Sequence, residues 1–192
     1  MRVHVAISLD HIGKPDNPAT SADEKDDRGA ISGGVEEVDL TAVYVFAMDR
    51  ELRRLGGHDV TILTDGWYSD RWKRADAYET DVYVACHVNA GGGNRGIVFH
   101  DYRTALGRTE TGTGKDLARI VSVHLAAVVP WPVFAEGAAP GDNAYHCIKG
   151  TDAIAILLEP GFLDNPMHRE WMLAHAKDIG KAVAGGIHEW AN

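Results

Sequence analysis

Two histidines and a glutamate follow three strongly apolar segments of the chain. They are His11 after residues 3–9, His87 at the end of residues 81–87, and Glu159 after residues 153–158. Side chains at the carboxyl ends of buried strands meet solvent while a rigid sheet holds them in place. Imidazole and carboxylate groups are zinc ligands, and a catalytic zinc site keeps one coordination position for water. The pattern therefore favours a metal-dependent hydrolase.

A second carboxylate is expected at the start of the helix that follows residue 36. Either Glu36 or Glu37 is in a position to supply it. A glutamate in the first turn of a helix also complements the helix dipole without any metal, and most histidines are not ligands. Because the chain has ten histidines, coincidence is a real alternative for each ligand taken singly. The residues alone do not choose between the two glutamates.

Glu159 stands out because it ends an apolar strand and is followed by Pro160 and Gly161. Carboxylates are almost never fully buried unless they are paired. One interpretation is a salt bridge to an arginine in the core. The other is a general base beside a metal-bound water, with its pKa raised by the apolar surroundings.

Composition indicates one globular domain that spans residues 1–192. The hydrophobic fraction is 45% and the charged fraction 24%, both ordinary for a soluble domain. The net charge of −9 argues against nucleic acid and anionic membranes as partners. Cys86 and Cys147 are expected to be small core residues, with a thiolate ligand or a disulfide as the less favoured alternative.

The first residues predict a strand and no export signal. Their apolar run is short, is interrupted by His4 and lacks a small-residue cleavage site. No segment approaches the length that a membrane-spanning helix needs. We therefore expect synthesis in the cytoplasm and no membrane insertion, with a removed leader or a missing domain as alternatives.

Strand and helix patterns alternate along the chain. Strands are predicted at residues 3–9, 60–64, 81–87, 96–100 and 153–159, and helices at 38–55, around 71–75, at 113–129 and at the C-terminus, where Ile179, Val183, Ile187 and Trp190 form an apolar stripe. Residues 12–36 and 135–144 are predicted to be loops, the first with a charged run that solvates the surface or, alternatively, shapes a substrate groove. The pattern predicts an α/β fold with a twisted, mostly parallel sheet covered by helices on both faces.

Several short motifs occur in an order that resembles a known family. They are Leu9–Gly13, Glu37–Thr41, Leu52 to Val60, Arg71 to Asp81, Ala85–Ala90 and Leu157–Asn165. Together they resemble the zinc-dependent N-acetylmuramoyl-L-alanine amidases of the Amidase_3 type, found in bacterial autolysins and phage endolysins. The resemblance covers nearly the whole chain.

The resemblance implies roles for five residues. It implies one catalytic Zn²⁺ held by His11, Glu37 and His87, and thereby selects Glu37 over Glu36. It also implies that Glu159 is catalytic, and Asn89, which recurs in the family's signature, is expected to contact substrate. The implied reaction is hydrolysis of the amide between N-acetylmuramic acid and L-alanine in peptidoglycan.

The loop of residues 12–36 is longer than the family pattern leads us to expect, and the sequence departs from that pattern at four further places. The turn at His11 lacks the glycine that precedes the histidine, Cys86 replaces a serine, Pro160 replaces a small polar residue, and Asp65 stands where an arginine is usual. Gly91–Gly93 either line the cleft or form a simple turn.

Two alternative functions remain open from the sequence. One is a zinc peptidase that acts on other peptide bonds, and the other is a non-catalytic peptidoglycan-binding or regulatory relative. A monomer is expected. The cellular setting is expected to be that of a phage endolysin released to the cell wall, or of an exported enzyme whose leader has been removed.

Overall fold

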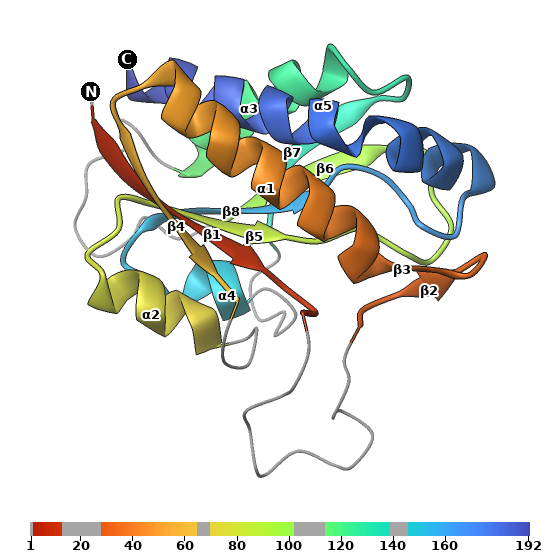
Figure 1. Cartoon of the computed structure of the whole chain (residues 1–192), viewed down its shortest axis with the longest axis horizontal. Helices are drawn as coiled ribbons and strands as arrows, with labels where there is room; N and C mark the ends of the chain where they lie inside the picture. The colour runs from red at the N-terminus through yellow and green to blue at the C-terminus, as the bar shows by residue number, and fades with distance from the viewer. Residues whose placement is uncertain (1, 13–27, 65–69, 102–113, 139–145) are drawn as a thin grey trace, which may run out of the picture.

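A computed structural model describes residues 2–12, 28–64, 70–101, 114–138 and 146–192 (Figure 1). The described strands are β1 (Val3–Leu9), β2 (Ile31–Ser32), β3 (Val35–Glu36), β4 (His58–Leu63), β5 (Val82–Cys86), β6 (Gly96–His100), β7 (Val133–Gly137) and β8 (Ile154–Glu159). The described helices are α1 (Glu37–Leu55), α2 (Arg71–Ala77), α3 (Gly114–Ala126), α4 (His146–Lys149) and α5 (Pro166–Ala191). No helix in these ranges is long and apolar enough to cross a membrane.

Six strands form one mixed sheet in the order β4-β1-β5-β8-β6-β7. Strands β4, β1, β5 and β8 are mutually parallel, whereas β6 pairs antiparallel with β8 and parallel with β7. Every residue of β5 is buried, as its continuous apolar run requires for a strand covered on both faces. The predicted α/β fold with a mostly parallel sheet is confirmed.

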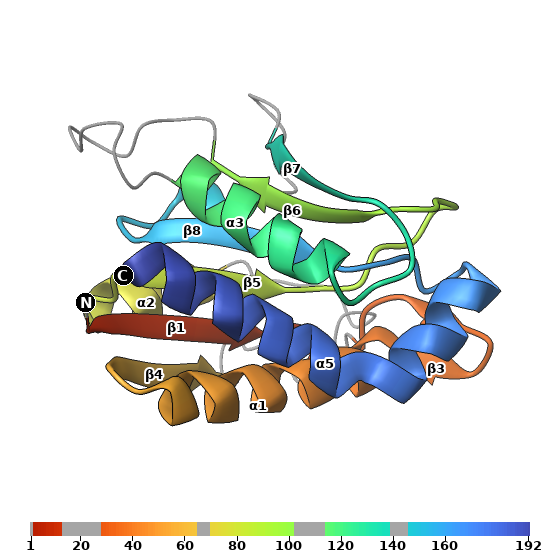
Figure 2. The same ribbon diagram turned by 90° about the horizontal axis from the view of Figure 1, so that it is seen from above.

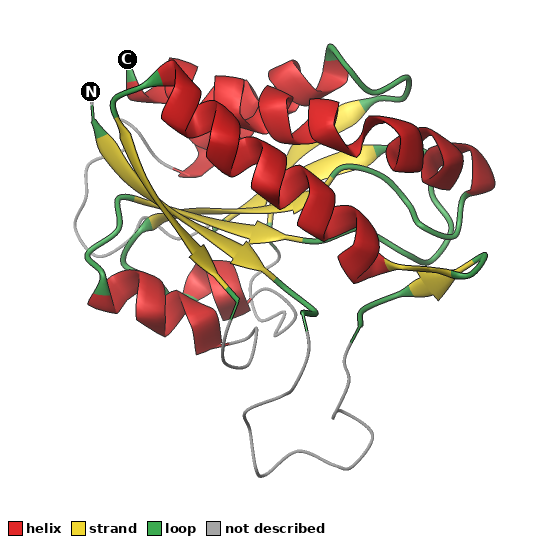
Figure 3. Cartoon of the chain, viewed as in Figure 1, coloured by secondary structure: helices red, strands yellow, loops and turns green. Residues whose placement is uncertain are grey.

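Helices cover the two faces of the sheet unequally. Figures 1 and 2 show α1, α3 and α5 side by side over one face, and Figures 1 and 3 show α2 and α4 on the other. Alternate strand residues point to the two layers, so that Ile7 and Val84 belong to the larger core while Ala6 and Tyr83 belong to the smaller one. This arrangement leaves the carboxyl ends of the parallel strands at one edge, beside the start of α1.

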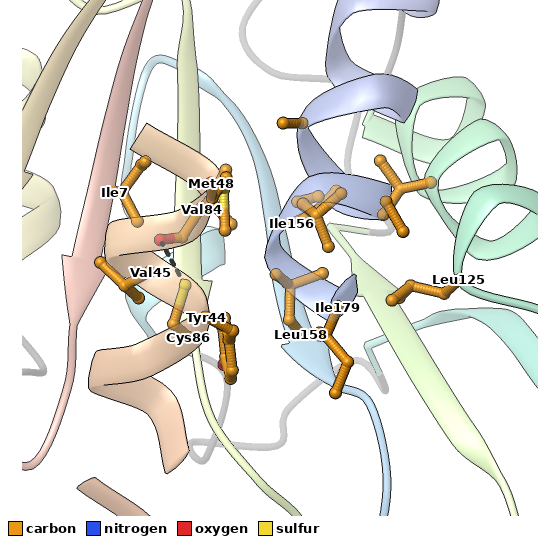
Figure 4. Close-up of a cluster of buried hydrophobic side chains, with 14 of the residues drawn as sticks. Ile7, Tyr44, Val45, Met48, Val84, Cys86, Leu125, Ile156, Leu158 and Ile179 are labelled. Carbon is orange, nitrogen blue, oxygen red and sulfur yellow. Dashed lines mark hydrogen bonds between the residues drawn. The ribbon is translucent and has the colours of Figure 1, made fainter. Parts of the chain in front are cut away.

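The larger core joins α1 and α5 directly to the sheet. Figure 4 shows Tyr44, Val45 and Met48 of α1 beside Val84, with Leu158 and Ile179 on the adjoining part of the core. Three residues of the predicted C-terminal stripe, Ile179, Val183 and Ile187, are buried, and Trp190 packs against the same core while partly exposed. The apolar stripe therefore faces the sheet, as its spacing predicts.

Two of the predicted loops contain short strands. Residues 31–36 form the antiparallel β2–β3 hairpin rather than a continuous loop, and residues 133–137 form the edge strand β7. The loop predictions are wrong at these positions, because strands this short or this exposed carry little alternation of apolar and polar residues. The charged run of the first loop and most of the second lie outside the described residues.

Candidate metal centre

Residues from three parallel strands and one helix meet at the carboxyl edge of the sheet. His11 follows β1, His87 follows β5, Glu159 ends β8, and Glu37 is the first residue of α1. Figure 3 shows the parallel strands ending on the side where α1 begins. Crevices outside the carboxyl ends of such strands are the usual ligand sites of open α/β sheets. Three of the residues predicted for the site, His11, Glu37 and His87, lie close together in the structure.

Three donor atoms form a compact triangle at this edge. Nε2 of His11 lies 3.2 Å from Nδ1 of His87 and 3.7 Å from Oε1 of Glu37, and that oxygen lies 3.2 Å from Nδ1 of His87. A tetrahedral zinc site with ordinary bond lengths requires donor separations of about 3.3–3.6 Å. The triangle thus fits a cation held by two nitrogens and one oxygen. The imidazoles are 13% and 14% exposed, so the group meets solvent on one side.

The two glutamates that the sequence could not separate have different surroundings. Glu36 is the N-cap of α1, and its carboxylate accepts a hydrogen bond of 2.6 Å from Nε of Arg28. Glu37 is buried and faces His11 and His87. The β2–β3 hairpin ends at Glu36, and α1 begins at the next residue, Glu37. The hairpin therefore sets where the Glu37 backbone lies. The geometry favours Glu37 as the carboxylate of the triangle.

Main-chain amides fix the Glu37 carboxylate. The N–H of Ala30 donates to Oε2 at 3.0 Å, and the N–H of Val88 donates to Oε1 at 2.8 Å. Burial raises the pKa of Glu37, but the hydrogen bond and charge of His87, with smaller effects of His11 and Ala30, outweigh it and leave the pKa below its ordinary value. Glu37 is therefore an oriented anion.

His87 is fixed through both its main chain and its ring. Its N–H donates to the carbonyl of Leu158 at 3.0 Å, and the hydroxyl of Tyr44 donates to its carbonyl at 2.9 Å. Its Nε2 lies 2.8 Å from Oδ2 of the buried Asp10. Burial lowers the pKa of His87, but Asp10 and Glu37 outweigh burial and raise it to about 10.

The turn at His11 takes an unusual backbone conformation. His11 has φ of 60°, in the left-handed region that residues other than glycine seldom adopt. Such strain costs about 1–3 kcal/mol and persists where the surroundings enforce it. From this backbone conformation the ring of His11 reaches the other two donors.

Glu159 lies beside the triangle with its carboxylate hydrogen-bonded to an amide. The side chain of Asn89 donates to Oε2 of Glu159. Burial raises the pKa of Glu159 to about 7, against the opposing effects of His87 and Asn89. Among the residues that the structure describes, the buried arginine is Arg71, and it pairs with Asp10. A raised pKa of this kind is a usual property of a carboxylate that acts as a general base.

The glycine loop after β5 is tied to the loop after β8. The N–H of Gly91 donates to Asp164 at 2.9 Å, and the side chain of Asn165 donates to the carbonyl of Gly93 at 2.9 Å. A Cβ on Gly93 would collide with the ring of Phe162. These contacts explain the glycine at position 93 by close packing, which favours the turn interpretation there.

The cysteines are core residues rather than ligands. Cys86 and Cys147 are both buried free thiols. Figure 4 shows the Cys86 sulfur directed toward the carbonyl of Val84, 3.8 Å away. Burial raises the pKa of both thiols, so neither is a thiolate. The prediction of small core residues is confirmed.

The sequence pattern gave no role to Asp10, Arg71 or Gly29. Asp10 lies against His87, Arg71 pairs with Asp10, and Gly29 lies against Glu37. Asp10 and Arg71 belong to the motifs that resemble the family, but those motifs assign them no function. Asp10 is a charged residue directly after an apolar strand, and Arg71 is a cation in a short helix. Neither pattern predicts which residue the side chain contacts. Gly29 lies against Glu37 with φ of 74°, and nothing in its sequence neighbourhood indicates this contact.

The chain matches the model of the N-acetylmuramoyl-L-alanine amidase family, Amidase_3, over residues 21–189. An endolysin of Bacillus phage SPP1 is 25% identical over 172 residues, which cover 86% of this chain. The chain spans 62% of that endolysin's length. His11 precedes the residues matched by the family model, so its place beside Glu37 and His87 is known from the geometry alone.

Solved structures share the fold over almost the full chain. The catalytic domain of CwlV, an N-acetylmuramoyl-L-alanine amidase from Bacillus (Paenibacillus) polymyxa var. colistinus, is 20% identical with a TM-score of 0.78, covering 98% of each chain. An N-acetylmuramoyl-L-alanine amidase from Clostridium difficile 630 is 19% identical with a TM-score of 0.79, covering 98% of this chain and 96% of the other. Because the family model matches most of its length, the chain belongs to the N-acetylmuramoyl-L-alanine amidase family.

Proposed function

We propose that the protein is a zinc-dependent amidase that hydrolyses the bond between N-acetylmuramic acid and L-alanine in peptidoglycan. The observation on which this depends is the triangle of His11, Glu37 and His87 beside a carboxylate, Glu159, whose pKa is raised to about 7. Family membership supplies the substrate class, since the matching family model describes N-acetylmuramoyl-L-alanine amidases.

His11, Glu37 and His87 would hold the zinc ion through Nε2, Oε1 and Nδ1. Two imidazoles and one carboxylate are a donor set of catalytic zinc, with a fourth position left for water or substrate. Bound there, zinc supplies a lowered water pKa and polarisation of the scissile carbonyl. The amides of Ala30 and Val88 keep Glu37 in the orientation that this binding needs.

Glu159 acts as the proton carrier of the reaction. As a carboxylate it accepts a proton from the water that attacks the lactyl carbonyl carbon. The carbon–nitrogen bond then breaks, and Glu159 returns the proton to the departing nitrogen. The products are a free lactyl carboxyl group on the glycan and a new amino terminus on L-alanine, which balances the addition of one water. The side-chain amide of Asn89 holds Glu159 in place. Contact with the substrate is a second proposed role of Asn89.

Several further points belong to the proposal. Residues 1–192 form one catalytic domain, which acts as a monomer on the cell wall. We place its action at the cell wall after endolysin-like release. The endolysin among the relatives supports this cellular setting. The net charge of −9 is consistent with a substrate other than nucleic acid.

Product analysis separates this proposal from its alternatives. Purified protein, with its zinc content measured, is incubated with isolated peptidoglycan, and the products are identified by mass spectrometry. New L-alanine amino termini with intact glycan strands support the amidase. Cleavage within the stem peptides would establish a peptidase instead, and absence of cleavage by zinc-loaded protein would indicate a non-catalytic wall-binding relative.

A further inference from the structure

A buried carboxylate lies behind the His87 ring, on the side away from the triangle. Asp10 is fully buried, and its Oδ2 lies 2.8 Å from Nε2 of His87. The other ring nitrogen of His87, Nδ1, faces Glu37 at 3.2 Å. Asp10 has no part in the proposed reaction, so its burial needs another explanation.

The second oxygen of Asp10 is held by two donors. Its Oδ1 accepts a hydrogen bond from the hydroxyl of Ser8 and another from Nη1 of Arg71 at 3.0 Å. A buried carboxylate is stable only when it is paired and hydrogen-bonded. Arg71 supplies the charge and Ser8 supplies a neutral donor, so that Oδ2 remains directed at His87.

Arg71 is itself fixed by the ends of two strands. It is the first residue of α2 and only 3% exposed. Nη1 also donates to the carbonyl of Leu9, and Nη2 donates to the carbonyl of Thr64 at 3.3 Å. The guanidinium thus ties the exits of β1 and β4 to Asp10. A planar group with several fixed donors suits this task, whereas the single ammonium of lysine does not.

We propose that Asp10 and Arg71 are positioning residues that prepare His87 to bind metal. Arg71 orients Asp10, and Asp10 presents Oδ2 to Nε2 of His87. When a metal takes the place of the Nδ1 proton, this carboxylate keeps the remaining ring proton on Nε2. The inference rests on the metal site of the proposed function, but not on the identity of its substrate.

The physical reason is the choice between two tautomers. A neutral imidazole carries one N–H, and a proton on Nδ1 would block metal binding there. An anionic acceptor at 2.8 Å from Nε2 favours the tautomer with its proton on Nε2. Partners that orient a metal-binding histidine in this way contribute about 10–100-fold to metal affinity.

The test measures zinc affinity of the metal-free full chain by competition with a chromogenic chelator at fixed pH. Asp10→Asn and Arg71→Gln should each weaken zinc binding by about 10–100-fold. Because Arg71 acts through Asp10, the double variant should bind little worse than Asp10→Asn alone. The absorption spectrum of bound Co²⁺ should change in Asp10→Asn, since the ligand ring is no longer held at Nε2.

Asp76→Asn is the matched control on the same helix as Arg71. Asp76 accepts hydrogen bonds from the hydroxyl of Thr151 at 2.5 Å and from the N–H of Asp152 at 2.9 Å. Its loss should lower thermal stability without changing zinc affinity or the Co²⁺ spectrum. A purely structural role for Asp10 would make the two variants behave alike.

Three results would overturn the proposal. They are unchanged zinc affinity in folded Asp10→Asn, equal losses in Asp10→Asn and Asp76→Asn, and fully additive effects of the Asp10 and Arg71 changes. Should Asp10→Asn fail to fold, Ser8→Ala removes one donor to Asp10, and unchanged zinc affinity in that variant would count against the proposal. Wild-type protein that binds zinc but leaves peptidoglycan intact would refute the proposed function and leave this inference standing.

Discussion

The main chain at Gly29 touches the carboxylate of Glu37 so closely that no side chain fits between them. A Cβ on Gly29 would lie 2.5 Å from Oε2 of Glu37 and 2.7 Å from its Cβ. Gly29 also has φ of 74°, which glycine adopts readily and other residues do not. The next residue, Ala30, donates to the same oxygen. The segment before the hairpin therefore shapes the position of Glu37.

We predict that Gly29→Ala weakens metal binding, because the added methyl group must displace the Glu37 carboxylate. Zinc affinity measured by chelator competition should fall by about 10-fold or more. Gly34→Ala is the control, since Gly34 has φ of 77° but a Cβ added there meets no atom within 4 Å. Gly34→Ala should unfold at a lower temperature, because alanine is strained at this φ, and its zinc affinity should be unchanged. Equal affinities of the two variants would contradict this role of Gly29.

The central sheet was predictable because its inner strands are apolar on both faces. Strands β1, β5 and β8 read as continuous apolar runs, and parallel strands with such runs end at one edge. The positions of His11, His87 and Glu159 followed from that rule alone. The choice of Glu37 over Glu36 required the family resemblance, since the sequence pattern places both near the start of the same helix.

The rest depended on contacts between residues distant in the sequence. Asp10 meets Arg71 only because β1 and β4 are neighbours, and no local pattern gives that pairing. The β2–β3 hairpin has two residues in each strand, too few for alternation to be visible. Asn89 was expected at substrate, but its bond to Glu159 depends on the register between β5 and β8.

The histidine ligands can be tested against a histidine pair at the other end of the strands. His11→Ala and His87→Ala should each abolish stoichiometric zinc binding, because two remaining protein ligands hold zinc poorly. His188→Ala is the control: Nδ1 of His188 lies 2.9 Å from Nε2 of His58, the first residue of β4. Zinc content after gel filtration, measured by atomic absorption, should be retained in this control. Full occupancy in His87→Ala would show that His87 is no ligand.

Glu159→Gln should separate metal binding from turnover. The amide keeps the size of the side chain but cannot accept a proton, so peptidoglycan hydrolysis should fall by about 10²–10⁴-fold. Zinc content should be unchanged. Glu51→Gln is the matched control, because Glu51 is a carboxylate of α1 that pairs with Arg54 at 2.6 Å near the end of the helix farther from Glu37. It should keep most activity, and substantial turnover by zinc-loaded Glu159→Gln would remove Glu159 from the mechanism.

The raised pKa of Glu159 fixes the direction of the acid limb of the pH profile. A general base works only when deprotonated, so activity should rise with pH through the pKa of Glu159. Burial raises that pKa to about 7 in the metal-free protein. A bound cation stabilises the carboxylate and lowers the pKa, so the midpoint of the limb should lie at or below that value. Initial rates across a pH series at saturating zinc measure the midpoint, which Glu159→Gln should eliminate.

Asn89→Ala should move the same limb to higher pH. The amide of Asn89 donates to the Glu159 carboxylate and lowers its pKa, so its removal favours the protonated form. A hydrogen bond to a charged group contributes about 1.5–3 kcal/mol, which corresponds to a shift of roughly one pH unit or more. Asn94→Ala is the control from the same loop, since Oδ1 of Asn94 lies 3.0 Å from Nε2 of His168 and so engages a different partner. A lower rate in Asn89→Ala at an unchanged midpoint would instead favour a contact between Asn89 and the substrate.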